Sequence, residues 1–124
     1  SAAEQGLQSL ESSVEASILA KMGDRGQIKG AVIDGPLSLD AAIDKESAAT
    51  KGIGGEVAGN ADCLLFPNLD AGNIFYKMNS KMSKAQMGAF VAGAKVPCVL
   101  SSRGDSTQTK LNSIALCAML AINS

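Results

Sequence analysis

The sequence of 124 residues contains no histidine and no tryptophan, and aromatic residues make up only 3% of it. Without imidazole the chain cannot build a Ser-His-Asp triad, a Cys-His dyad or a histidine-ligated metal site. Any chemistry must therefore come from serine, arginine, lysine, carboxylates, asparagine and backbone N–H groups. The abundant alanine and the 13 glycines favour layers that pack at close backbone distance rather than a core anchored by large rings.

An excess of either charge is also missing, because 11 Lys+Arg oppose 12 Asp+Glu and leave a net charge of −1. A general nucleic-acid binder would carry a basic face, so we expect no nucleic-acid partner. No apolar run approaches the ~20 residues that a membrane-spanning helix needs, and no signal peptide is visible. These observations predict a cytoplasmic protein with no membrane partner.

The three cysteines, Cys63, Cys98 and Cys117, are widely spaced, and each lies in an apolar stretch. No CxxC pair occurs, and no histidine is present to activate a thiol as a nucleophile. We expect buried, reduced thiols that act as small apolar side chains in a reducing compartment.

Apolar periodicity predicts a first helix over residues 9–22, with Leu10, Val14, Ile18 and Met22 on one stripe and Gly23 as its C-terminal cap. After this helix, a short apolar run, a break and an amphipathic helix follow one another three times. The runs are residues 29–33, 63–66 and 96–100, and the helices are 38–49, 70–82 and 105–122. Residues 84–94 fit either a helix or a helix that runs into a strand.

Short apolar runs that alternate with helices indicate strands buried on both faces, and hence a parallel sheet with crossover helices. In such a sheet the loops after the strands meet at one edge, where ligands bind. The three loops are residues 34–38, 67–73 and 101–106. We expect Ser38 or Asp40 to cap the first of the helices that follow, and Asp70 to cap the second.

The third loop combines the hydroxyls of Ser102 and Ser106 with Arg103 and Gly104, just before a helix begins. A helix N-terminus attracts phosphate or a developing oxyanion, and a guanidinium fork fits phosphoryl oxygens. In the alternative interpretation, Asp105 and Ser106 only cap the helix, and Arg103 is a solvated surface charge. The residues alone leave both interpretations open.

A structural and a functional interpretation are also both open for the second loop and for the lysines that follow it in the sequence. Asn68, Asp70 and Asn73 fit helix capping and turn formation as well as ligand contact. Lys77, Lys81 and Lys84 share one helical face, which is typical of a solvated surface. Contact with an anionic cofactor tail is the alternative.

Three ordered motifs resemble the phosphate acetyl/butyryltransferase family. They are residues 32–40 (Val-Ile-Asp-Gly-Pro-Leu-Ser-Leu-Asp), residues 66–77 with their Pro-Asn-x-x-Ala-Gly-Asn-x-x-Tyr-Lys pattern, and residues 96–106 followed by 109–116. The last of these is similar to the butyryl-type branch rather than to the acetyl-type branch.

The resemblance implies an acyltransferase that converts an acyl-CoA and phosphate to an acyl phosphate and CoA. The expected acyl-CoA is butyryl-CoA. It implies a three-layer α/β/α sandwich with a mainly parallel sheet, like that of the isocitrate and isopropylmalate dehydrogenases. Residues 1–124 would form a single domain, the C-terminal fragment of a two-domain enzyme whose cleft holds the site. Family members form homodimers or larger homo-oligomers, and the fragment alone would be inactive.

The resemblance also implies the site residues. Ser102, Arg103 and Asp105 would be catalytic, and the substrate-binding residues would be Asn68, Gly72, Asn73, Gly104 and Ser106. Coenzyme A and phosphate would be substrates, with no tightly bound cofactor and no metal. In the acetyl-type branch an aspartate stands seven residues after the serine, where this chain has Thr109. The general base would therefore be Asp105 or a group outside this segment.

Two other functions compete with this one. A phosphate acetyltransferase would perform the same chemistry on a shorter acyl group. A non-catalytic module that binds CoA or an anion, or that serves oligomerisation, would use the same loops for regulation or assembly.

Overall fold

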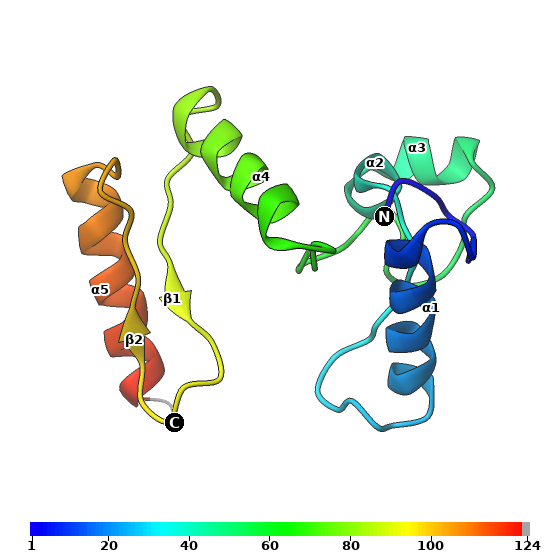
Figure 1. Cartoon of the computed structure of the whole chain (residues 1–124), viewed down its shortest axis with the longest axis horizontal. Coiled ribbons are helices and arrows are strands. Elements are labelled where there is room, and N and C mark those ends of the chain that lie inside the picture. The colour runs from blue at the N-terminus through cyan, green and yellow to red at the C-terminus, as the bar shows by residue number, and fades with distance from the viewer. Residues whose placement is uncertain (123–124) are drawn as a thin grey trace. The chain divides into compact units, whose positions relative to one another are not determined.

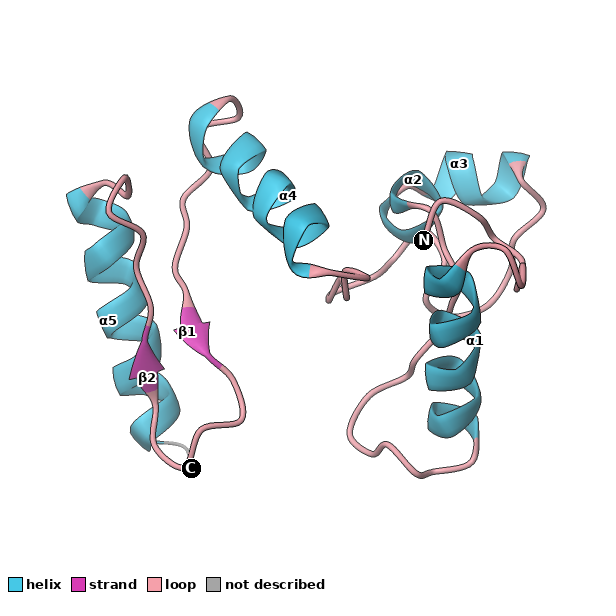
Figure 2. Ribbon diagram, in the orientation of Figure 1, coloured by secondary structure: helices cyan, strands magenta, loops and turns pink. Residues whose placement is uncertain are grey.

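The structure is a computed structural model that describes residues 1–122 as helices, short strands and loops (Figures 1 and 2). Its internal contacts divide the chain into two compact units, Ser1–Gly72 and Asn73–Ser124. The first unit contains α1 (Glu11–Asp24), α2 (Leu39–Ile43), α3 (Lys45–Thr50) and the start of α4 (Leu69–Lys81). The second contains the rest of α4, β1 (Phe90–Val91), β2 (Cys98–Val99) and α5 (Thr107–Ile122). The prediction that residues 1–124 are one domain stays a prediction.

The first helix of the chain ends two residues later than the sequence suggests, at Asp24 rather than at Met22. α1 continues through Gly23, and Gly26 terminates it with a backbone φ of 70°. Gly26 N donates to Gly23 O, and Gln27 N donates to Met22 O, both at 2.9 Å. This pair of bonds is a Schellman cap, which needs glycine at the left-handed position. The prediction that Gly23 is the cap was wrong; a Cβ there would lie 3.0 Å from Ile33 Cβ, so this glycine instead allows close packing.

The buried side of α1 is formed by small residues rather than by the predicted aliphatic stripe. Ser13 is fully buried, whereas Ile18 is 55% exposed. Ser13 Oγ accepts a hydrogen bond from Leu7 N at 2.8 Å and lies 2.7 Å from Leu10 O. The small side chain of Ala16 also leaves room for the backbone at Gly35, where a Cβ would lie only 3.2 Å away. Close backbone approach of this kind is what the alanine- and glycine-rich composition favours.

The helix predicted over residues 38–49 is divided in two at Asp44. Asp44 has extended backbone angles, and its Oδ2 accepts from Ser47 N at 2.8 Å, which caps α3. Ser38 occupies the N-cap position of α2, but its side chain makes no cap hydrogen bond. Ser38 is therefore the cap residue by position, as predicted, but its hydroxyl is directed to carboxylates rather than to the helix N–H groups.

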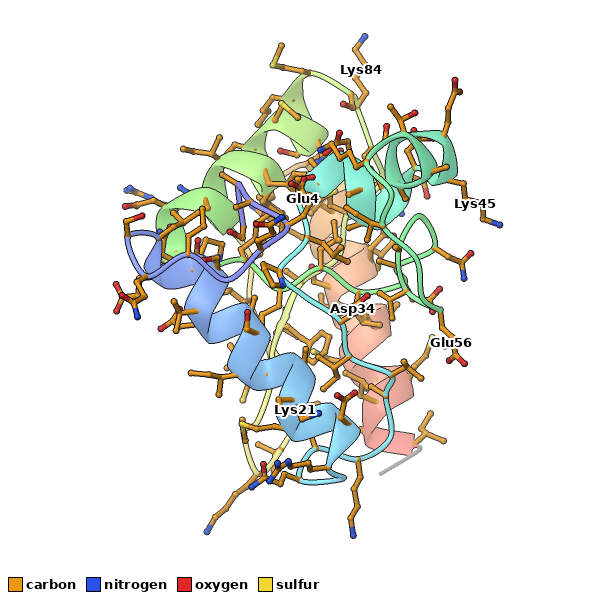
Figure 3. The ribbon with its side chains drawn as sticks, turned by 90° about the vertical axis from the view of Figure 1, so that its right-hand side faces the viewer. Glu4, Lys21, Asp34, Lys45, Glu56 and Lys84 are labelled. Atoms are coloured by element: carbon orange, nitrogen blue, oxygen red, sulfur yellow. The ribbon has the colours of Figure 1, made fainter. Side chains whose placement is uncertain are left out.

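A cluster of charged and polar side chains ties the N-terminal segment to α2 and α3. Lys51 Nζ lies 2.9 Å from a carboxylate oxygen of Glu4, labelled in Figure 3, and 2.9 Å from one of Asp40. Ser38 Oγ contacts both carboxylates. These hydrogen bonds, from Ser38 first and then from Lys51, lower the pKa of Asp40 to about 2. The cluster therefore stays ionised at neutral pH.

The second unit is a two-stranded ribbon with α5 packed against it (Figure 1). β1 and β2 pair antiparallel, with Phe90 opposite Val99 and Val91 opposite Cys98. Ser113, fully buried on α5, donates to Thr109 O and accepts from Ala89 N at 2.9 Å. These bonds attach α5 to the segment that enters β1. Residues 84–94 thus form a loop and a strand, with no helix among them.

The predicted parallel sheet is not present in residues 1–122. The one sheet there has two strands and is antiparallel, and residues 29–33 and 63–66 form no ladder. Both of these apolar segments instead line a cavity of about 370 Å³ in the first unit. Val32 is 67% exposed and Leu65 is 79% exposed. A strand is defined by backbone pairing, and within the first unit neither segment has a partner strand, so their apolar residues do not form a sheet.

The cysteines follow the same pattern. All three are free, but only Cys117, on α5, is buried; Cys98 is half-buried and Cys63 is exposed. The prediction of buried thiols was therefore wrong for Cys63, which lies in one of the unpaired apolar segments. None of the helices that the structure describes is long and apolar enough to cross a membrane.

Two glycines with left-handed backbone angles test how tightly the first unit is packed. Gly59 has φ 72°, and a Cβ there would lie 2.7 Å from Lys45 Cα; Gly30 has φ 85°, and a Cβ would meet nothing within 4 Å. We expect Gly30→Ala to lower the free energy of unfolding by about 1 kcal/mol, from backbone strain alone. Gly59→Ala should cost about 1–3 kcal/mol more, because the Lys45 backbone must move. Urea unfolding measures both, and equal losses would contradict the close approach.

Candidate functional site

The loop between β2 and α5 is closed into a tight turn by Asp105. Ser102 N donates to Asp105 Oδ2 at 2.7 Å. Asp105 N donates in return to Ser102 O at 3.1 Å. The two bonds hold Arg103 and Gly104 at the tip of the turn. One carboxylate oxygen of Asp105, the candidate general base, is therefore used to shape the loop.

Ser106 begins the helix that follows the turn. Its Oγ accepts from Thr109 N at 3.1 Å, so Ser106 is the N-cap of α5. Its Oγ also lies 3.0 Å from Thr109 Oγ1. Thr109 is only 9% exposed and is thus part of the packing at the start of α5. The predicted start of this helix is confirmed, and the Ser106 hydroxyl is occupied as a cap.

Two lysines of α4 reach the turn. Lys77 Nζ donates to Ser102 Oγ at 3.0 Å, and Lys81 Nζ donates to Gly104 O at 2.7 Å. Residues four apart share one face of a helix, so a single face of α4 holds the turn at two points. Lys77 is half-buried at this contact, which the expectation of a solvated basic stripe missed, whereas Lys81 is exposed as expected. Lys84 follows the end of α4, and its side chain extends outward from the backbone (Figure 3).

Tyr76 lies beside these contacts. Its phenol oxygen is buried and makes no hydrogen bond with any residue that the structure describes. Burial, and after it the carboxylate of Asp105, raises the pKa of Tyr76. Asp105 acts here as an electrostatic neighbour rather than as a hydrogen-bond partner of good geometry. The ammonium of Lys77 lies 5.2 Å from the centroid of the Tyr76 ring, a cation–π distance.

Arg103 is exposed at the tip of the turn. Within residues 1–122 it makes no hydrogen bond and no ion pair. The guanidinium is charged at every physiological pH and presents a planar fork of donors. The turn therefore offers a permanent cation beside a serine hydroxyl and a helix N-terminus, a combination that suits an anion.

The residues of the second motif have structural positions on α4. Asn68 Oδ1 accepts from Ala71 N at 2.9 Å, so Asn68 is the cap of α4. The predicted cap, Asp70, lies instead in the first turn of the helix. Gly72 faces the Phe66 ring, where an added Cβ would lie 3.7 Å from Phe66 Cβ. Asn73 is exposed.

The structure thus brings together part of the predicted site. Ser102, Arg103, Gly104, Asp105 and Ser106 form one turn within the second unit. Asn68 and Gly72 belong to the first unit. Their contact with a substrate, like that of Asn73, stays a prediction.

Sequence reasoning missed the contacts that Tyr76, Lys77 and Lys81 make with the turn. The available signal was the spacing of four residues between the two lysines, which puts them on one face. No spacing in the sequence relates residue 77 to residue 102. Within the described part of the chain, no cluster of three or more cysteine and carboxylate side chains could hold a metal ion.

A model of the phosphate acetyl/butaryl transferase family matches residues 1–118. The chain belongs to this family. The tight Ser102–Asp105 turn at the start of α5 lies within the matched residues. The resemblance drawn from the three motifs is thereby confirmed.

Curated relatives of this chain carry both family names. Phosphate butyryltransferase of Clostridium beijerinckii is 54% identical over 113 residues, which are 91% of this chain and 37% of the relative. Phosphate acetyltransferase of Thermotoga maritima is 50% identical over 108 residues, which are 87% of this chain and 37% of the relative. The chain thus spans a little over a third of the length of these relatives.

A solved structure supports the fold. A branched-chain phosphotransacylase from Enterococcus faecalis matches with a TM-score of 0.82 and 38% identity, over 95% of this chain and 42% of that chain. This member of the family is therefore an α/β chain with a small sheet, structurally like a phosphotransacylase.

The position of Asp105 beside Tyr76 can be tested by titration, because Tyr76 is the single tyrosine of a chain without tryptophan. We expect tyrosinate absorbance to develop above the usual pKa of about 10, because burial and the Asp105 charge both disfavour the phenolate. Asp105→Asn should lower the pKa of Tyr76 without fully restoring its ordinary value, because burial remains. An unchanged titration curve would contradict the proximity of the two side chains. Asp70→Asn, on the exposed first turn of α4, is the matched control.

Proposed function

We propose that this chain carries the phosphate- and acyl-binding part of an enzyme that converts butyryl-CoA and phosphate to butyryl phosphate and CoA. The observation that carries the proposal is the Ser102–Asp105 turn at the N-terminus of α5. There an exposed arginine, a serine hydroxyl and the free N–H groups of the helix are adjacent, and no described acidic side chain pairs with the arginine. Because the chain belongs to the phosphate acetyl/butaryl transferase family, we assign this cationic turn to acyl transfer between CoA and phosphate.

The proposed reaction is a direct transfer. A phosphate oxygen attacks the thioester carbon, a C–O bond forms, and the carbonyl oxygen becomes an oxyanion in a tetrahedral intermediate. The intermediate collapses, the C–S bond breaks, and the sulfur leaves as thiolate and takes up a proton to give the CoA thiol. No covalent bond to the protein is needed, in keeping with a chain that has no histidine to activate a nucleophile.

The residues of the turn fit the charges of this path. Arg103 would neutralise the phosphate and the oxyanion, since a guanidinium binds two oxygens at once. The Ser102 hydroxyl would donate to a reacting oxygen, an interaction that strengthens as negative charge develops there. For proton transfer at sulfur, Asp105 is the candidate in this segment, because Ser102 N engages only its Oδ2.

We propose the butyryl group as substrate because the butyryltransferase relative is the more similar of the two at 54% against 50% identity. We propose further that the three-layer dehydrogenase-like fold with its parallel sheet, and a homodimer or larger assembly, form in the complete enzyme. Exposed apolar residues such as Val32 and Leu65 support further packing of this kind. The three free thiols support a reducing compartment, the cytoplasm.

The function can be tested in a chimera in which the 113 aligned residues of this chain replace the matching segment of the Clostridium beijerinckii enzyme. We expect release of CoA thiol from butyryl-CoA only when phosphate is present. Arg103→Ala should lower kcat/KM by about 100- to 1,000-fold, the usual loss when a group that stabilises an oxyanion is removed. Arg103→Lys should recover only part of the activity, because an ammonium lacks the planar fork.

The matched control is Arg25→Ala, which removes the other arginine of the chain. Arg25 ends α1 in the first unit, so its loss should leave the kinetics unchanged. Full activity of the Arg103→Ala chimera would contradict the proposed role of the turn. A parallel assay with acetyl-CoA decides the acyl preference, and a higher kcat/KM for acetyl-CoA would overturn the butyryl assignment.

We expect the 124-residue chain by itself to release no CoA thiol. It spans only 37% of its Clostridium beijerinckii relative, and the second unit alone supplies the described cationic turn. Phosphate-dependent thiol release by the isolated chain, abolished in Arg103→Ala, would contradict this expectation. It would show that the site is complete within these residues.

A further inference from the structure

The hydrogen bond between Lys77 and Ser102 determines how the serine hydroxyl is used. Lys77 Nζ lies 3.0 Å from Ser102 Oγ. An ammonium group has three donors and no acceptor, so the Ser102 oxygen must be the acceptor. The hydroxyl hydrogen of Ser102 therefore points away from Lys77 and remains to be donated.

No described residue takes this hydrogen. The backbone N–H of Ser102 has its own acceptor, Asp105 Oδ2 at 2.7 Å. The one hydrogen bond that the structure describes at Ser102 Oγ is that from Lys77. Ser102 is half-buried, and a hydroxyl in such a position gains from an acceptor. Solvent water or a bound ligand is therefore left to accept this hydrogen.

Lys77 is itself held in place. Its ammonium lies over the Tyr76 ring at 5.2 Å. One turn further along α4, Lys81 Nζ holds Gly104 O at 2.7 Å. The two lysines differ in what they touch. Lys81 binds the main chain of the turn, whereas Lys77 binds the one side chain whose hydroxyl is still available.

We propose that Lys77 is a positioning residue that orients the Ser102 hydroxyl toward an anionic oxygen of the substrate. This inference rests on the proposed function and extends it. The ligand chemistry is a phosphate oxygen or the oxyanion of the tetrahedral intermediate, and both require a donor. The adjacent ammonium also polarises the O–H bond. A hydroxyl that accepts a hydrogen bond from a cation becomes a stronger donor in its own hydrogen bond. Lys77 thus acts through Ser102 rather than on the substrate directly.

The first test is a double-mutant cycle on phosphate binding by the full 124-residue chain. The dissociation constant of inorganic phosphate is measured from NMR shifts of the Ser102 and Gly104 amides in four proteins: the parent, Lys77→Met, Ser102→Ala and the double variant. We expect each single change to weaken binding by about tenfold, as for a lost hydrogen bond to a charged group. The double variant should lose no more than either single variant, because both changes remove the same interaction.

Lys84→Met is the charge-matched control. It removes the same charge as Lys77→Met, but the Lys84 side chain extends outward from the backbone (Figure 3). It should leave the phosphate affinity within about twofold, as expected for an exposed charge. Lys77→Arg, which again presents only donors, should restore much of the affinity that Lys77→Met loses.

Three results would overturn the inference. Multiplicative losses in the double variant would mean that Lys77 attracts phosphate by its own charge. An unchanged affinity in Lys77→Met would mean that the contact serves the fold alone. Absence of phosphate binding by the parent chain would mean that the Ser102 hydroxyl does not serve an anionic oxygen in this chain.

A second readout in the chimera separates this inference from the proposed function. If Lys77 orients Ser102 toward developing charge, Lys77→Met should lower kcat by tenfold or more and leave KM for butyryl-CoA nearly unchanged. An active parent chimera whose kcat is unaffected by Lys77→Met would overturn the role of Lys77 and leave the function standing. An inactive parent chimera would overturn the function, while the phosphate cycle would still judge the coupling of Lys77 to Ser102.

Discussion

The attachment of the Ser102–Asp105 turn to α4 is the interaction on which the candidate site depends. Without Lys77 and Lys81 the turn would be shaped only by its own hydrogen bonds between Ser102 and Asp105. The lysines fix it at a side chain and at a carbonyl, and Arg103 between these points remains exposed. These contacts restrict the freedom of a short cationic turn, which matters because a preorganised donor loses little when a transition state forms.

The same residues show why helix caps and ligand sites are hard to tell apart. Asn68 and Ser106 were both candidates for substrate contact, and each has its side-chain oxygen on a helix N–H. Asp105, the candidate base, holds the Ser102 backbone. Arg103 and the Ser102 hydroxyl are different, because neither donates to a described residue. Arg103 and the Ser102 hydroxyl are therefore the two candidate groups that the local structure leaves free for the proposed substrate.

Several parts of the fold were predictable because they depend on local interactions. The apolar periodicity that ends at Gly23 predicted α1, and the capping hydroxyl of Ser106 predicted the start of α5. Both signals are local, since helices form from contacts three and four residues apart. The strands were not predictable in the same way. Residues 29–33 and 63–66 have apolar side chains typical of buried strands, yet a strand requires a partner, and the first unit supplies none. β1 and β2 pair across a short loop and are antiparallel.

By itself the sequence determined the family, through three ordered motifs, and it excluded imidazole chemistry, through the absence of histidine. It also determined that Ser102, Arg103 and Asp105 share one loop. Only the tertiary structure decided that Lys77 reaches Ser102, that Lys81 reaches Gly104, and that Cys63 is exposed. The physical reason is distance along the chain. Helix caps and turns are set by neighbours in sequence, whereas a hydrogen bond between residues 77 and 102 exists only once α4 and the turn are packed together.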